Sequence, residues 1–96
     1  MKKLEAVIRP EKLKPVRKAL AEMAILGMTV TDVAGRGCQT GITLQWRAGE
    51  YHVALLPKVK IKVVVIDEDV GKAVSAIVRE ARTGAHGDVK IFILPV

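Results

Sequence analysis

The sequence of 96 residues predicts an α+β fold with elements in the order β-α-β-β-α-β. Four segments are strand-like, most of them alternating apolar and polar residues, and two repeat apolar residues every three or four positions, as one face of a helix does. Half of the residues are hydrophobic but only 3% are aromatic, so the core must be aliphatic, which suits a sheet covered by helices. A chain of this length forms one domain, residues 1–96.

The first strand and the first helix are predicted near the start of the chain. Residues 3–9 form the strand, whose inward side carries Leu4, Ala6 and Ile8. From about residue 12 a helical stripe follows, made of Leu13, Val16, Leu20 and Met23. Pro15 falls in the first helical turn, where its missing N–H is tolerated, and Gly27 is expected to stop the helix.

A second strand and a long loop are predicted next. Residues 28–34 are rich in β-branched side chains, which favours a strand, and Gly35 ends it. Residues 36–56 contain several glycines and show no sustained period, so they predict a loop of about twenty residues. Ordinary connections have about four to six residues, and a loop this long in a small domain usually carries function.

The second half of the chain repeats the pattern. Residues 58–66 alternate lysines with apolar residues and then become wholly apolar, which predicts a third strand that ends buried at Val64 and Val65. Asp67 is expected to cap a second helix, whose apolar stripe is Val70, Ala73, Val74, Ile77 and Ala81. Residues 90–94 form the last strand. This order matches the ferredoxin-like βαββαβ fold, an antiparallel sheet with both helices on one face.

The charge and the cysteine content limit the class of protein. Sixteen lysines and arginines against ten acidic residues give a net charge of +6, which attracts phosphates and acidic metabolites. The basic residues are dispersed without an RNA-binding aromatic motif or zinc-finger spacing, so no nucleic-acid partner is expected. The single cysteine, Cys38, excludes an intrachain disulfide, and no apolar run reaches signal-peptide or membrane-spanning length. We therefore expect a cytoplasmic protein without membrane insertion.

Two glycine-punctuated segments are the candidates for ligand binding, and none is found for catalysis. No serine elbow or nucleophile-base arrangement is present, and His52 and His86 lack the partners that a metal site needs. Residues 35–41 and 82–90 hold glycines that let backbone amides approach an anion, and the second segment adds Arg82, Thr83 and Lys90. The alternative is that both segments are turns, with Gly84 as a helix C-cap, and spacing alone favours turns. Likewise, the row of Lys58, Lys60 and Lys62 is either a solvated strand face or part of a ligand site.

Four separated segments together resemble the P-II nitrogen regulatory proteins. They are MKKLEAVIRPEKL at 1–13, GMTVTDVAGRGCQTG at 27–41, RAGEYHVALLPKVKIKVVV at 47–65 and ARTGAHGDVKIFILPV at 81–96. The resemblance implies a ferredoxin-like homotrimer with an effector site in each cleft between subunits. Such a protein is a regulator of nitrogen metabolism rather than an enzyme. It binds ATP or ADP, and in many members also Mg²⁺ and 2-oxoglutarate.

The resemblance also implies a role for individual positions. Carried over residue by residue, the effector site would be formed by Thr29, Gly37, Cys38, Gln39, Gly41, Lys58, Thr83, Gly84, Gly87, Asp88, Val89 and Lys90. Gln39 would also ligate Mg²⁺ and, with Lys58 and the backbone near Gly41, would receive 2-oxoglutarate. Residues 36–56 match the T-loop, which contacts targets, and residues 82–90 match the phosphate-binding B-loop.

Two positions in the T-loop match residues that act on other proteins. Arg47 matches the residue that enters the pores of ammonium channels, and Tyr51 matches the tyrosine that is uridylylated in some members. The implied partner is therefore an ammonium channel or a nitrogen-assimilation enzyme. For Tyr51 the alternative is an ordinary tyrosine of an exposed loop.

Departures from the family pattern keep a second interpretation open. Arg36, Cys38, Thr40 and Val89 stand where the family usually has Phe, Arg, Lys and Gly. A β-branched residue in place of glycine disfavours positive φ near the expected phosphate loop, and loss of an arginine removes a phosphate contact. The alternative function is a divergent sensor of another small anion, such as AMP or ADP with bicarbonate, on the same trimer.

Overall fold

The computed structural model describes residues 1–35, 45–47, 50–52, 55–84 and 89–96, with only the backbone of residues 45–47 and 50–52. The elements are β1 (Lys2–Ile8), α1 (Leu13–Glu22), β2 (Thr29–Gly35), β3 (Gln45–Arg47), β4 (Glu50–His52), β5 (Leu56–Val65), α2 (Val70–Ala81) and β6 (Val89–Pro95). A short 3₁₀ helix precedes each α-helix, at Pro10–Lys12 and at Asp67–Asp69.

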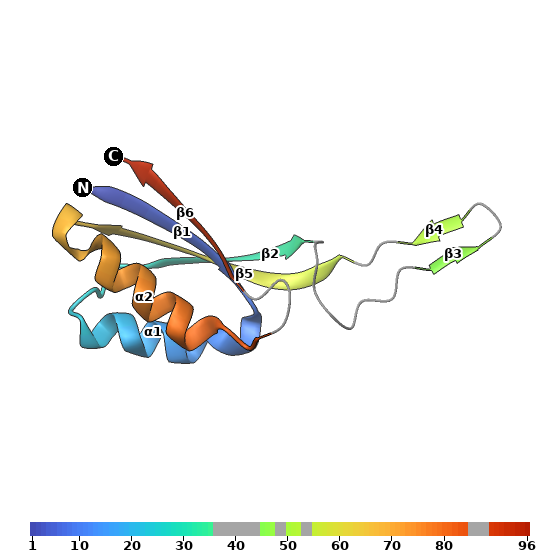
Figure 1. Ribbon diagram of the computed structural model, residues 1–96, viewed down its shortest axis with the longest axis horizontal. Coiled ribbons are helices and arrows are strands. Elements are labelled where there is room, and N and C mark those ends of the chain that lie inside the picture. Colours follow the sequence, from blue (N-terminus) through green and yellow to red (C-terminus); the bar gives the residue numbers. More distant parts are fainter. Residues whose placement is uncertain (36–44, 48–49, 53–54, 85–88) are drawn as a thin grey trace.

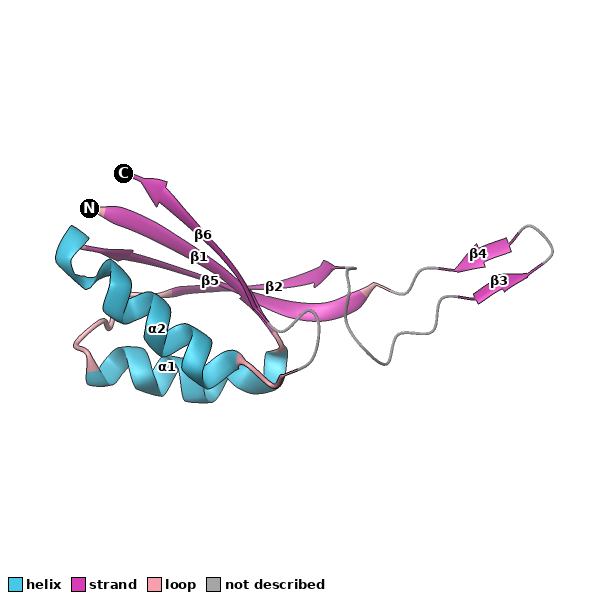
Figure 2. Ribbon diagram, viewed as in Figure 1, coloured by secondary structure: helices cyan, strands magenta, loops and turns pink. Residues whose placement is uncertain are grey.

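Four strands form one antiparallel sheet in the order β2-β5-β1-β6, and both α-helices cover the same face of it (Figures 1 and 2). The predicted ferredoxin-like βαββαβ arrangement is therefore confirmed. A second, two-stranded sheet pairs β3 with β4 and projects beyond the end of the main sheet (Figure 1). The expectation that residues 36–56 lack regular structure is wrong for this hairpin and for Leu56, where β5 begins.

The core lies between the sheet and the two helices. Alternate residues of the two central strands are buried in it: Leu4, Ala6 and Ile8 of β1, and Val59, Ile61, Val63 and Val65 of β5. The helices contribute the buried side chains of Val16, Leu20, Ala73, Ile77 and Ala81. Burial of each large aliphatic side chain stabilises the fold by about 1.5–3 kcal/mol. The face of the sheet that carries no helices is called the open face below.

Strand alternation corrects one prediction on β5. Val64 and Val65 were both expected to be buried, but Val64 is 50% exposed while Val65 is 4% exposed. Successive side chains of a strand point to opposite faces, so Val64 lies on the open face of the sheet. An apolar run does not by itself bury both sides of a strand.

The end of α1 also differs from the prediction. The helix ends at Glu22, and Ala24, not Gly27, adopts the left-handed conformation, with φ of 62°. The Ala24 N–H donates to the carbonyl of Ala21 at 2.9 Å, and the Ile25 N–H donates to the carbonyl of Leu20 at 2.9 Å. This pair of bonds defines a Schellman motif, a C-terminal helix cap that ordinarily has glycine at the left-handed position.

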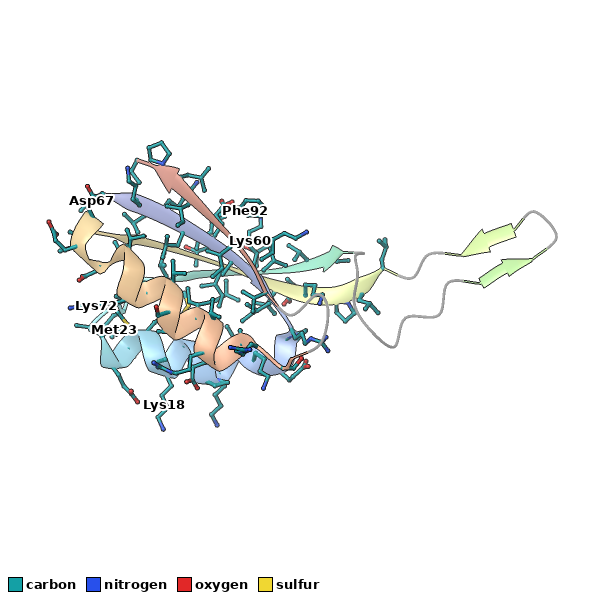
Figure 3. The ribbon with its side chains drawn as sticks, viewed as in Figure 1. Lys18, Met23, Lys60, Asp67, Lys72 and Phe92 are labelled. Atoms are coloured by element: carbon teal, nitrogen blue, oxygen red, sulfur yellow. The ribbon has the colours of Figure 1, made fainter. Side chains whose placement is uncertain are left out.

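Asp67 begins the 3₁₀ helix and does not cap α2, contrary to the prediction. The residue that flanks α2 is Asp69, which has helical backbone angles and makes no side-chain capping bond. The Asp67 carboxylate instead lies 3.0 Å from the Met1 amine, at the end of the sheet far from the hairpin (Figure 3). The hydrogen bond and the positive charge of that amine lower the pKa of Asp67.

We predict that Ala24→Gly stabilises the protein by about 0.5–1 kcal/mol, because glycine adopts positive φ without the steric cost that alanine carries. Urea denaturation at one fixed protein concentration measures the change as a shift of the midpoint at constant slope. The matched control is Ala21→Gly, inside the exposed side of α1, which should destabilise by about 0.5–1 kcal/mol. A loss of stability in Ala24→Gly would contradict the proposed Schellman cap.

We also predict an acid-dependent contribution from Asp67. Its pKa is lower in the folded state than in the unfolded state, so its contribution is complete above the unfolded value of about 3.9. The contribution is lost as the pH falls through the lowered folded pKa. The urea midpoints of wild type and Asp67→Asn should therefore differ near neutral pH and converge in acid. Glu68→Gln, the neighbouring control, should change the midpoint little, and equal midpoints of wild type and Asp67→Asn at neutral pH would refute the prediction.

Candidate functional site

The candidate site lies at the end of the sheet from which the hairpin leaves. Three segments that are distant in the sequence meet there, because the end of β1 is flanked by the beginnings of β5 and β6. Ile8 of β1 pairs with Val59 on one side and with Val89 on the other. Each of three adjacent strands therefore carries a basic residue at or just beyond this end: Lys58 in β5, Arg9 after β1 and Lys90 in β6.

The open face at this end is cationic. Lys60, Val7 and Lys90 occupy one row across β5, β1 and β6, so the backbones that carry the two ammonium groups are about 10 Å apart. Lys58 lies two residues from Lys60 and on the same face. Within the described residues, neither Lys60 nor Lys90 makes an ion pair. Figure 3 shows Lys60 on the side of the sheet opposite the helices.

The lysines along β5 differ in their charged neighbours. Lys62 lies 3.9 Å from Glu5, and Lys3 lies 3.6 Å from the same carboxylate oxygen. Glu5 thus partly neutralises the Lys62 end of the row, while Lys60 makes no ion pair with the described residues. This arrangement favours a ligand-facing role for Lys60 over that of a lysine on an evenly solvated strand.

The segment after α2 leaves the helix at Arg82. Arg82, at the helix end, has extended backbone angles and donates its N–H to the carbonyl of Val78 at 3.1 Å. Gly84 has φ of +89° and a hypothetical Cβ on it would meet nothing within 4 Å, so its backbone angle rather than crowding requires glycine. The alternative prediction of Gly84 as the helix C-cap is wrong, because Arg82 occupies that position.

Val89 does not stand among the cations. It is the first residue of β6, its backbone φ is negative, and its side chain packs against the core. Lys90, the next residue, lies on the open face. A β-branched residue is accommodated here without backbone strain, because position 89 is an ordinary strand position.

Thr29 is separated from the other predicted residues within one chain. It pairs with Lys62, whereas Val33, four residues further along β2, pairs with Lys58. At strand geometry this places Thr29 about 13 Å along the sheet from the Lys58 row. The structure therefore places Lys58, Lys60 and Lys90 at the same end of the open face, whereas Val89 faces the core and Thr29 lies apart.

Several predicted positions lie outside the described residues: Arg36, Gly37, Cys38, Gln39, Thr40, Gly41, His86, Gly87 and Asp88. Arg47 and Tyr51 fall on the backbone of the hairpin, where Arg47 pairs with Glu50 and Tyr51 with Trp46. Arg47 is the last residue of β3, and Tyr51 is the middle residue of β4.

No role was predicted for Arg9 from the sequence. It directly follows β1 at this end of the sheet, is half-buried, and its Nε is shielded from solvent. In the sequence, Arg9 is recognisable only as a basic residue at the end of a predicted strand. The described residues contain no group of three potential metal ligands and no helix long and apolar enough to cross a membrane.

Comparisons with known proteins agree over the whole chain. A model of the family described as Nitrogen regulatory protein P-II matches residues 1–96. The chain is 54% identical to Nitrogen regulatory protein P-II of Klebsiella oxytoca over 96 residues, which are 100% of this chain and 86% of that protein. It is 55% identical over 93 residues to Nitrogen regulatory protein P-II 2 of Methanothermobacter thermautotrophicus, covering 97% and 81% of the two chains. Identity to Nitrogen regulatory protein P-II 1 of Escherichia coli K12 is 54% over 96 residues, with 100% and 86% covered.

Proposed function

This chain belongs to the P-II family of nitrogen regulatory proteins, and we propose that it is a homotrimeric sensor of ATP and ADP that signals through its hairpin. The family consists of regulators that bind effectors and act on target proteins, so the prediction of a regulator rather than an enzyme is confirmed. The observation that supports the proposal is the cationic end of the open face, where Lys58 and Lys60 of β5 and Lys90 of β6 lie on either side of β1.

The chemistry of these residues fits a polyphosphate. Lysine ammonium groups form charge-assisted hydrogen bonds with phosphate oxygens. The predicted residues outside the described part, Gly37, Cys38, Gln39, Gly41, Gly87 and Asp88, would complete the nucleotide site. Gln39 would ligate Mg²⁺, and Lys58 would meet a carboxylate of 2-oxoglutarate.

Two observations support assembly into a trimer. Val64 and Phe92, on the open face, are each 50% exposed, and burial of such apolar area against copies of the chain would stabilise an oligomer. Thr29 and Lys90 stand on the two opposite edge strands of one chain, β2 and β6. A cyclic, head-to-tail contact brings different surfaces of two copies together, so the Thr29 edge of one copy would meet the Lys90 edge of the next.

The hairpin is the proposed output. Lys58 lies two residues into β5, whose first residue is Leu56, so a ligand at Lys58 acts on the strand that leads directly into the hairpin. A ligand shifts such an element only if it binds one of its conformations more tightly than another. Arg47 and Tyr51 would then present contact and uridylylation sites to a cytoplasmic target, such as an ammonium channel or a nitrogen-assimilation enzyme.

We predict that Mg-ATP and 2-oxoglutarate bind synergistically and that Lys58→Ala abolishes the synergy. Lys90→Ala should weaken ATP about 10- to 100-fold, the loss expected for one charge-assisted contact of about 1.5–3 kcal/mol. Isothermal titration with ATP, ADP and AMP, each with and without Mg²⁺ and 2-oxoglutarate, measures both effects.

Lys72→Ala is the control for this titration, because Lys72 is an exposed lysine of α2 (Figure 3). It should bind like wild type. Binding of AMP or ADP together with bicarbonate, without ATP binding, would favour the alternative anion sensor that the departure at Cys38 suggests. No binding of any adenylate would overturn the nucleotide-sensing proposal.

We further predict that Phe92→Lys weakens the trimer at least about tenfold, because a charge replaces apolar area at the centre of the proposed contact. Analytical ultracentrifugation over a dilution series measures the dissociation. Val78→Lys introduces the same charge at an exposed valine of α2 and should leave the trimer unchanged. If Phe92→Lys and wild type dissociate alike, the open face is not the subunit contact.

A further inference from the structure

A groove of about 610 Å³ lies between α1 and β2, on the helix side of the sheet. Its wall is the basic side of α1, with Lys14, Arg17 and Lys18. Its floor is apolar and includes Leu26, Met28 and Val30. None of these residues belongs to the candidate effector site.

The wall concentrates positive charge. Positions 14, 17 and 18 are spaced by three and four residues, so their side chains lie on one face of the helix. All three are exposed, and no ion pair involves them among the residues that the structure describes. Figure 3 shows Lys18 pointing away from the body of the protein below α1.

The floor exposes large aliphatic side chains beside this charge. Leu26 is 77% exposed and Val30 is 43% exposed, while Met28 packs partly against the core. β2 is an edge strand of the main sheet, so no further strand of that sheet lies beside it next to the groove. Apolar area bordered by charge is typical of a surface that contacts another molecule.

We propose that this groove binds an acidic amphipathic segment of a partner protein. Apolar side chains of the segment would pack on Leu26 and Val30, and its carboxylates would pair with Lys14, Arg17 and Lys18. Charge complementarity selects an acidic partner. A protein segment fits better than a small ligand, because small-ligand sites hold polar groups at fixed positions, whereas these cations stand on exposed, flexible stems.

The groove and the apolar part of the proposed trimer contact lie on opposite faces of the sheet, although both involve β2. That contact uses the open face of the sheet, whereas the groove is on the helix side. The inference does not rest on the proposed nucleotide function, and either can fail without the other.

Fluorescence anisotropy with a labelled amphipathic peptide tests the proposal on the full chain. The peptide carries leucines on one helical face and glutamates on the other, and a scrambled peptide of the same composition is the reference. We expect the ordered peptide to bind more tightly than the scrambled one. Arg17→Glu with Lys18→Glu should weaken binding at least about tenfold, because attraction becomes repulsion, and added salt should weaken binding to wild type.

Matched variants distinguish binding in the groove from unspecific electrostatic binding elsewhere on the protein. Leu26→Ser removes an apolar floor residue and should also weaken binding, whereas Leu55→Ser removes a 65% exposed leucine outside the groove and should not. Lys72→Glu reverses a charge on α2 and should leave binding nearly unchanged. Equal losses in Lys72→Glu and in the Arg17 and Lys18 variant would overturn the proposal.

Two further outcomes would identify a different occupant and likewise overturn the proposal. One is binding to anionic lipid vesicles that depends on Arg17 and Lys18, without binding of the peptide. The other is a changed sedimentation of Leu26→Ser, which would show that a second copy of the chain covers the groove.

Discussion

The alternation of side chains along β5 is the constraint on which the rest of the structure depends. Its even-numbered and odd-numbered residues serve different purposes, since Val59, Ile61, Val63 and Val65 build the core while Lys58, Lys60 and Lys62 face away from the helices. β5 is also a central strand, paired with both β1 and β2. A shift of its register by one residue would expose the core valines and bury the lysines, so one pairing fixes both the fold and the cationic face.

The sequence was sufficient for the parts of the fold that repeat a period. The stripes of α1 and α2 and the alternation of β1 and β5 predicted the arrangement of the layers, because burial of a periodic face leaves little choice of partner. The ends of elements were less predictable. Ala24 takes a left-handed conformation that glycine would occupy more easily, and Asp67 pairs with the Met1 amine instead of capping α2. Both depend on tertiary neighbours that no local pattern contains.

The hairpin and the candidate site were predicted with different success, for physical reasons. Each hairpin strand has three residues, too few for a period to be recognised, so β3 and β4 were hidden in a segment expected to be irregular. The residues of the candidate site came from the family resemblance, since glycine spacing alone favoured plain turns. What the sequence could not give was the distance of Thr29 from the Lys58 row, which follows only from the register of β2 with β5.

β2 connects the two surfaces that have been described. Val30, at its beginning, lies on the floor of the groove, and Gly35, at its end, leads toward the hairpin. The strand is paired with β5 along all seven of its residues, so it does not move independently of the cationic row. Coupling between a groove partner and an effector would therefore require a displacement of β2 and β5 together, or a change in how copies of the chain meet at the β2 edge. A change in how the copies meet would disrupt the core less, because the outer edge of β2 pairs with no strand within the main sheet of one chain.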